Sequence, residues 1–229
     1  MNIRKQILVS AGTVGVMLAA AGWAYGRLPA QLAVRWDIHG AAAGFLDRGL
    51  ALLIVPAITV ILTALFALAP ALMPERSRLE RSTEAWSAVW MVVLGTMLFG
   101  QVLMVVANLG VPLNVPRLAS LVAAVVIFVV GNWLGKVRHN FIFGLRTPWT
   151  LADERVWDKT HRFTGRLMVL CALVLAVAAL VVPVFSQSNL VLFAILIASA
   201  AGPALAGIVY SASIARPANR SAANRGPQP

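Results

Sequence analysis

Residues 86–109 read WSAVWMVVLGTMLFGQVLMVVANL, a stretch without a single Asp, Glu, Lys or Arg. As a helix, a segment of this length crosses a hydrocarbon core about 30 Å thick. Five further apolar segments of comparable length lie at about 6–26, 50–73, 116–134, 166–185 and 189–213. The sequence therefore predicts an all-α integral membrane protein, a six-helix transmembrane bundle, rather than a soluble domain.

The composition of the chain agrees with this prediction. Its 229 residues are 60% hydrophobic and 12% charged, whereas soluble domains are about 25% charged. In a soluble protein the formal charge of +11 would point to nucleic acid, but membrane proteins gather Lys and Arg in cytoplasmic loops. We therefore expect the lipid bilayer, and not nucleic acid, as partner. A single cysteine, Cys171, excludes an intrachain disulfide.

The positions of Lys and Arg predict the orientation of the bundle. Four of the 19 lie in alternate connections: Arg27, Arg35, Arg48 and Arg117. The other fifteen are Arg4, Lys5, Arg76, Arg78, Arg81, Lys136, Arg138, Arg146, Arg155, Lys159, Arg162, Arg166, Arg216, Arg220 and Arg225. Because cytoplasmic connections carry the excess, both termini are predicted to face the cytoplasm of a bacterial inner membrane. The loops at about 27–49, 110–115 and 186–188 are then external.

The positions of the spans and loops predict four regions of the chain. Residues 1–73 hold the first two spans and the external first loop, and residues 74–115 hold the third span with its flanking loops. Residues 116–214 hold spans four to six and the basic fourth loop, and residues 215–229 form a polar tail that we expect to be disordered. Spans one to three and spans four to six show the same order: a span, a long loop, a span, a short loop and a span. This favours a 3+3 inverted repeat as a hypothesis.

The interior of the spans offers little for chemistry. Carriers and proton pumps keep ionisable groups at membrane depth, yet no Asp, Glu, Lys, Arg or His lies in the middle of a predicted span. Polar residues such as Gln101, Asn108 and Ser120 are interpreted as hydrogen-bonding groups between helices. We expect no enzyme, no cofactor and no metal, and a small transporter or lipid-handling protein stays open as an alternative function.

The fourth loop, residues 131–166, reads GNWLGKVRHNFIFGLRTPWTLADERVWDKTHRFTGR. Thr150 and Asp153 have the spacing of a helix start, and Pro148 blocks an earlier one. We expect a helix from about Leu151 into the fifth span. A short amphipathic interfacial helix is predicted, with apolar residues facing lipid and basic residues reaching headgroups. The apolar set is Val156, Trp157, Thr160 and Phe163, and the basic set is Arg155, Lys159 and Arg162.

Two interpretations exist for the acidic residues of this segment. Glu154, Asp158 and His161 recur at i, i+4 and i+7 on one helical face, which would suit a divalent metal. Alternatively, Asp158 pairs with Arg162 four residues later and with Arg155 three residues earlier. We favour the ion pairs. The forked guanidinium of Arg146 could bind a carboxylate, a phosphate or backbone carbonyls. Alternatively, its charge could serve only to set the orientation of the chain in the membrane.

The run from Gly131 to Arg166 resembles the signature of the SdpI family of bacterial membrane proteins. In that signature, Gly-Asn-aromatic-x-Gly-Lys leads to Phe-Gly-x-Arg-Thr-Pro-Trp-Thr and then to Val-Trp-x-Lys-Thr-His-Arg. The resemblance defines a candidate functional loop of fourteen residues. They are Asn132, Lys136, Asn140, Gly144, Arg146, Thr147, Pro148, Trp149, Thr150, Trp157, Lys159, Thr160, His161 and Arg162.

The first loop, residues 28–49, reads LPAQLAVRWDIHGAAAGFLDRG and resembles the short amino-terminal domain of the same family, of the DUF1648 type. A Leu-Pro start leads into a β-like stretch and then into spaced glycines. The family often has histidine where this chain has Arg35 and asparagine where it has Asp37. The candidate external residues are Leu28, Pro29, Trp36, Gly40 and Gly44.

The resemblance implies a function that composition does not reveal. Members of this family protect a bacterium against a secreted, membrane-active peptide toxin, and some hold a cytoplasmic repressor at the membrane when toxin is present. The resemblance thus implies a non-enzymatic immunity or sensor protein. Its expected partners are a peptide outside and a repressor inside.

Overall fold

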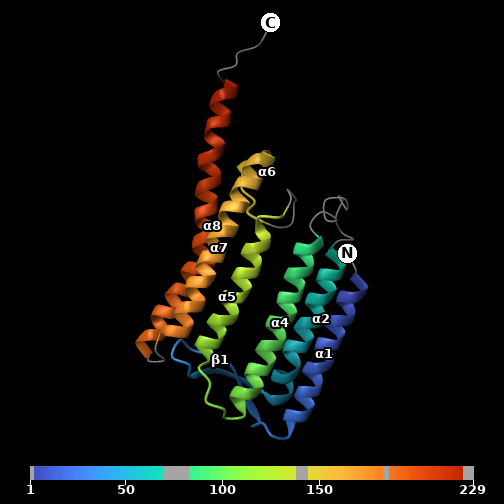
Figure 1. Ribbon diagram of the computed structural model, residues 1–229. Coiled ribbons are helices and arrows are strands. Elements are labelled where there is room, and N and C mark those ends of the chain that lie inside the picture. Colours follow the sequence, from blue (N-terminus) through green and yellow to red (C-terminus); the bar gives the residue numbers. More distant parts are fainter. Residues whose placement is uncertain (1–2, 70–82, 138–143, 183–185, 224–229) are drawn as a thin grey trace.

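The computed structural model describes residues 3–69, 83–137, 144–182 and 186–223. Within these residues, six helices are long and apolar enough to cross a membrane, and they lie side by side (Figure 1). They are α1 (Ile3–Tyr25), α2 (Arg48–Leu68), α4 (Thr83–Asn108), α5 (Val115–Leu134), α7 (Glu154–Val181) and α8 (Ser186–Ala223). The predicted six-helix membrane fold is confirmed.

The helices pack as two groups of three that are consecutive in the sequence. Helices α1, α2 and α4 contact one another, as do α5, α7 and α8, and α4 also packs against α5. The groups coincide with the two halves, spans one to three and spans four to six, that the alternation of long and short loops indicates. An inverted symmetry between the halves stays a prediction.

The closest helix pair, α5 and α7, depends on two facing glycines. A Cβ added to Gly165 would lie 2.6 Å from the carbonyl oxygen of Gly131, and one added to Gly131 would lie 2.7 Å from Cβ of Met168. Small residues at a crossing let two membrane helices approach to backbone contact. Any side chain at either glycine would therefore force these two helices apart.

A β-hairpin follows α1. Strands β1 (Gln31–Trp36) and β2 (Ala42–Asp47) pair antiparallel, with an irregular register around Arg35. The side chain of Asn108, at the end of α4, fastens the hairpin to the bundle. Its Oδ1 accepts the N–H of Ala33 at 2.8 Å, and its Nδ2 donates to the carbonyl oxygen of Ala33 at 2.9 Å. Asn108 therefore bonds α4 to the hairpin, and not to another helix as predicted.

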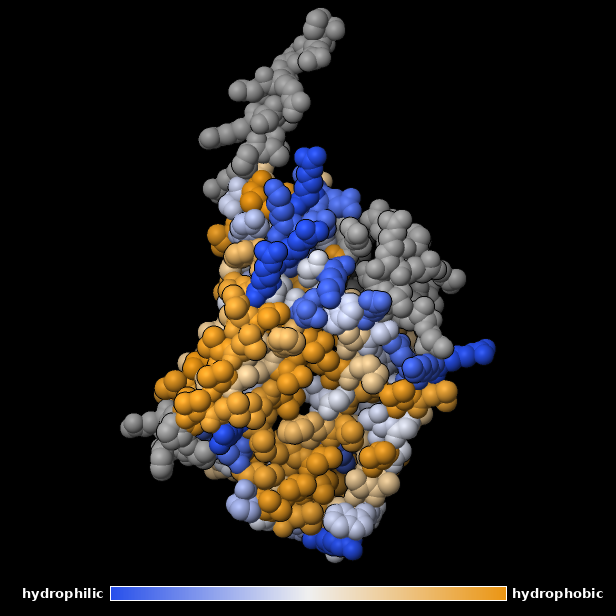
Figure 2. Space-filling view, viewed as in Figure 1, coloured by the Kyte–Doolittle hydropathy of each residue, from blue (hydrophilic) through white to orange (hydrophobic). Residues whose placement is uncertain are grey.

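The two ends of the bundle differ in what they carry. Both termini and the short helix α6 (Pro148–Ala152) lie at one end, and the hairpin lies at the other (Figure 1). Figure 2 shows hydrophobic residues covering the middle of one face and hydrophilic residues gathered toward the α6 end. The alternation of charged connections fits this division. Arg76, Arg78, Arg81, Arg138 and Arg225 lie outside the described residues.

The tail differs from the expectation. Helix α8 continues to Ala223, so residues 215–223 are helical where the composition predicts disorder. Extending a helix that already exists adds one backbone hydrogen bond per residue, without the cost of starting a new one. Residues 224–229 lie outside the described part of the chain, and the four predicted regions stay a prediction.

Candidate functional site

The fourth loop is organised by two helix caps instead of one. Before α6, the Thr147 and Thr150 side chains each accept the other's backbone N–H, at 3.2 and 2.9 Å. Before α7, the Asp153 carboxylate accepts the N–H of Arg155 at 2.7 Å. The predicted start at Thr150 with Asp153 is therefore wrong. Asp153 has an extended backbone, which separates α6 from α7 and makes each helix need its own cap.

Hydroxyl groups connect this loop to α8. The Thr150 hydroxyl donates to the carbonyl oxygen of Leu145 at 2.7 Å, and the Thr147 hydroxyl lies 3.2 Å from that of Ser211 on α8. Thr147, Thr150 and Ser211 are all buried. Because a buried hydroxyl without a partner is costly, this network fixes the position of α6 against α8.

His161 is the centre of the loop and is 1% exposed. Its Nε2 accepts the N–H of Leu145 at 3.0 Å, and its Nδ1 lies 2.8 Å from the carbonyl oxygen of Trp157. A carbonyl oxygen only accepts, so Nδ1 carries the proton and the imidazole is neutral in this arrangement. The ring stacks on Trp157 with centroids 3.9 Å apart, and Trp157 Nε1 donates to the carbonyl oxygen of Val137 at 3.0 Å.

Gly144 completes this cluster. Its φ is +106°, and an added Cβ would lie 2.1 Å from Nε2 of His161. The position therefore needs glycine both for its backbone and for the space that the imidazole occupies. We call Gly144, Leu145, Trp157 and His161 the imidazole cluster.

The metal interpretation of the acidic residues is wrong. Among the described residues, no group of three His, Cys, Asp or Glu side chains could hold a metal ion. His161 is buried with both ring nitrogens bonded, while Glu154 is exposed. The alternative also fails, because Asp158 forms no ion pair with Arg155 or Arg162, all three being described. Exposed pairs of this kind gain little free energy.

The lipid-facing assignment on α7 needs a correction as well. Val156, Trp157 and Thr160 are at most 5% exposed and pack inside the protein, whereas Phe163 is 38% exposed. The pattern of apolar residues marked a buried face, but this face meets other helices and not lipid. The amphipathic interfacial helix itself stays a prediction.

The other candidate residues of the loop lie on the surface. Those exposed are Asn132, Lys136, Gly144, Arg146, Pro148, Trp149, Lys159 and Arg162. Asn140 lies outside the described residues. The Arg146 guanidinium forms no hydrogen bond or ion pair with another residue of the described chain, so the shape of the loop depends on the imidazole cluster and the hydroxyl network.

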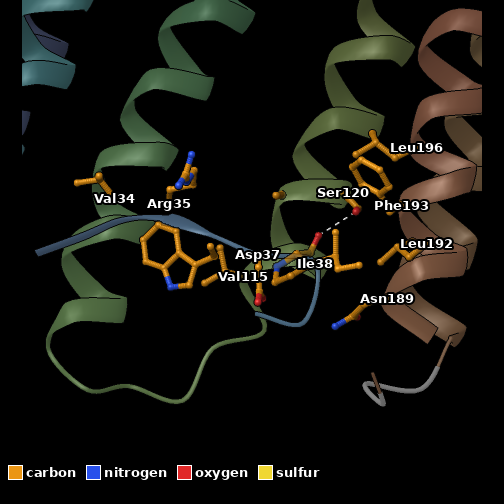
Figure 3. Close-up of a pocket in the computed structure, with 13 residues that line it drawn as sticks. Val34, Arg35, Asp37, Ile38, Val115, Ser120, Asn189, Leu192, Phe193 and Leu196 are labelled. Carbon is orange, nitrogen blue, oxygen red and sulfur yellow. Dashed lines mark hydrogen bonds between the residues drawn. The ribbon is translucent and has the colours of Figure 1, made fainter. Parts of the chain in front are cut away.

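A second feature lies at the opposite end of the bundle. A pocket of about 310 Å³ opens between the hairpin, α5 and α8 (Figure 3). Figure 3 shows Arg35 and Asp37 on the hairpin side, Ser120 on α5 and Asn189 with Phe193 on α8. Asn189 is 6% exposed and has no hydrogen-bond partner among the described residues. The rest of the lining is largely apolar and includes Val34, Ile38, Val115, Leu192 and Leu196.

The candidate residues of the first loop divide between packing and turn geometry. Leu28 is 4% exposed in the core beside the hairpin, and Trp36 lines the pocket. Gly40, with φ +84°, makes the turn, and Gly44 lies against the Arg35 side chain. Pro29 is exposed. Sequence reasoning missed Asn189 and the α8 wall, because the pocket joins segments distant in the chain.

Two family models match this chain. Residues 136–210 match the SdpI/YfhL protein family, and residues 12–60 match a domain of unknown function, DUF1648. The chain is also 26% identical over 156 residues to the Immunity protein SdpI of Bacillus subtilis (strain 168), a match covering 67% of this chain and 71% of that relative. The chain belongs to the SdpI family. No solved structure matches it.

The two family-model matches coincide with the two features described above. The match at residues 136–210 begins at Lys136 and includes α6, the imidazole cluster and most of α8. The match at residues 12–60 includes the whole hairpin. As a member of the SdpI family with six apolar helices, the chain is a multi-pass bacterial membrane protein whose surroundings are the lipid bilayer.

Proposed function

We propose that this SdpI family member is a membrane immunity protein that protects a bacterium against a secreted, membrane-active peptide. The relative from Bacillus subtilis is named an immunity protein, and the pocket at the hairpin end carries the proposal further. It offers a buried amide, that of Asn189, which has no hydrogen-bond partner in the described chain and is available to a ligand. The proposed role requires no catalysis.

The lining of this pocket suits a segment of peptide. Leu192, Phe193 and Leu196 offer an apolar wall for a hydrophobic side chain. Asn189 can both donate to and accept from a peptide backbone. Binding sites are commonly apolar cavities with a few placed polar groups. In the proposed orientation the pocket faces outward, because the hairpin loop carries few of the Lys and Arg residues.

Helix α8 provides a route from this pocket to the other side of the membrane. Asn189 lies at its hairpin end, and Ser211, more than twenty residues further along α8, contacts Thr147 of the fourth loop. We propose that peptide binding at Asn189 alters this contact. The exposed Arg146 and Lys159 would then present the state of the loop to a cytoplasmic repressor.

The test fills the pocket without disturbing the core. Ala119 lines the pocket and is exposed, so Ala119→Trp adds a large ring inside the cavity. Val125→Trp is the matched control, because Val125 lies on the same helix and is 59% exposed. Both variants and the unmodified protein are expressed in a Bacillus subtilis 168 derivative that lacks its own SdpI and is grown beside the parent strain.

We expect the unmodified protein and Val125→Trp to restore survival, and Ala119→Trp to lower it at matched membrane levels. Survival no better than with empty vector, although the protein is present in the membrane fraction, would contradict immunity. Equal survival with all three proteins would keep immunity and remove the pocket as the site of peptide contact.

A further inference from the structure

A basic groove lies between α5 and α7 at the end of the bundle that carries α6. Its volume is about 580 Å³, and its residues come from the last turn of α5, the two residues that follow α5 and the middle of α7. They are Gly131, Asn132, Gly135, Lys136, Arg162, Gly165, Arg166, Val169 and Leu170. Three of the nine are cations and none is an acid, so the groove has a strong positive charge.

No acidic side chain in the described part of the chain neutralises the cations of this groove. Lys136 lies over the ring of Trp133, 4.3 Å from its centroid. Arg162 and Arg166 are exposed, and neither forms an ion pair or a hydrogen bond with another residue in the described ranges. The close approach of α5 and α7 at Gly131 and Gly165 brings these like charges together. Their mutual repulsion is relieved by an anion between them.

The groove also changes from charged to apolar along its length. Beyond Arg166, α7 carries no charged side chain from Leu167 to Val181. Val169 and Leu170 continue the groove below the cations, and Leu170 is 59% exposed. The three cations therefore lie at the boundary of the apolar span, where phospholipid headgroups lie. A free phosphate would use only the charged part, whereas a phospholipid uses both.

We propose that this groove binds one anionic phospholipid. Its headgroup phosphate contacts Lys136, Arg162 and Arg166, and an acyl chain lies along Val169 and Leu170. Arginine forks bind phosphate oxygens in pairs, and basic sites between membrane helices suit anionic headgroups. The inference does not depend on the immunity function.

The test compares two pairs of neutralised arginine and lysine residues on α7. Arg162→Gln with Arg166→Gln removes charge from the groove, whereas Arg155→Gln with Lys159→Gln removes the same charge from exposed positions outside it. Full-length protein in detergent is mixed with phosphatidylglycerol, and the bound lipid is counted by native mass spectrometry. Phosphatidylcholine and glycerol 3-phosphate are the comparison ligands.

We expect phosphatidylglycerol binding to fall about 30-fold in the groove variant and to stay unchanged in the control. Val169→Trp, which alters the apolar part alone, should also weaken binding. Equal losses in the two double variants would overturn the proposal in favour of general surface charge. If the unmodified protein binds phosphatidylcholine or glycerol 3-phosphate as tightly as phosphatidylglycerol, the proposal is overturned as well.

Discussion

Gly144 shows how a single residue keeps the fourth loop in place. An alanine there would adopt an unfavourable φ and would also overlap the imidazole of His161. Gly110 has a similar φ of +85° but no atom within 4 Å of an added Cβ. The two positions therefore separate the cost of the backbone from the cost of the overlap.

We predict that Gly144→Ala lowers the thermal unfolding midpoint in detergent well below that of Gly110→Ala. Both variants lose about 1–2 kcal/mol to the left-handed backbone, and only the first adds about 1–3 kcal/mol of overpacking. The measurement is tryptophan fluorescence during heating, since Trp157 stacks on His161. Equal midpoints would show that the imidazole moves aside at little cost.

The sequence singles out these residues but does not reveal the contacts that they make. The motif from Gly144 to Thr150 and the Trp157 to His161 spacing single out this loop in the sequence. Helical periodicity places Trp157 and Thr160 on one face, yet lipid and protein interior are both apolar and select the same residues. Only the packing shows that this face is internal and that His161 uses both nitrogens within the loop.

At the scale of elements, one side chain from α4 is hydrogen-bonded to the hairpin. Asn108 satisfies both the N–H and the carbonyl oxygen of Ala33, and its Nδ2 also donates to the carbonyl oxygen of Met104 at 2.8 Å. Leucine has a similar volume and neither polar group. Asn108→Leu therefore removes three hydrogen bonds, two to backbone groups of β1 and one to a backbone carbonyl of α4.

We predict that Asn108→Leu accelerates amide hydrogen exchange in residues 31–36 while the interior of α4 stays protected. Each lost hydrogen bond is worth about 0.5–1.5 kcal/mol, which is enough to increase the population of the detached hairpin about tenfold. Asn132→Leu is the control, because Asn132 is exposed on α5. Unchanged exchange in β1 would mean that strand pairing alone holds the hairpin.

The elements themselves were predictable to different degrees. Hydropathy locates α1, α4 and α5 within three residues at each end, as for α5, expected at 116–134 and found at Val115–Leu134. Helix α7 begins twelve residues before the expected span at 166–185, and α8 ends ten residues after the expected span at 189–213. The first strand was anticipated only as a β-like stretch. The second was not, since AAGFLD has no β-branched residue and reads as a loop.

At the scale of the whole molecule, the arrangement of the two ends makes the orientation testable. Ala42, in the hairpin, and Ala152, in α6, lie at opposite ends of the bundle, and both are exposed. A cysteine at either position is therefore accessible to reagent on its own side of the membrane. A failure of either cysteine to react would therefore reflect its side of the membrane and not burial inside the protein.

We predict that, in a Cys171→Ser background, a cysteine at Ala42 reacts with an impermeant maleimide in intact cells. A cysteine at Ala152 should react only after permeabilisation, because the charge distribution predicts that α6 faces the cytoplasm. The reverse pattern would invert the molecule and move the pocket to the cytoplasmic side.

The grouping of the helices in two consecutive sets of three bears on biosynthesis. Every helix finds most of its neighbours within its own half, so α1, α2, the hairpin and α4 can assemble before the second half has left the ribosome. The α4–α5 contact and the α8 wall of the pocket form last. Completion of the pocket therefore waits for the synthesis of α8, and a truncated chain lacking α8 would have the hairpin without the α8 wall.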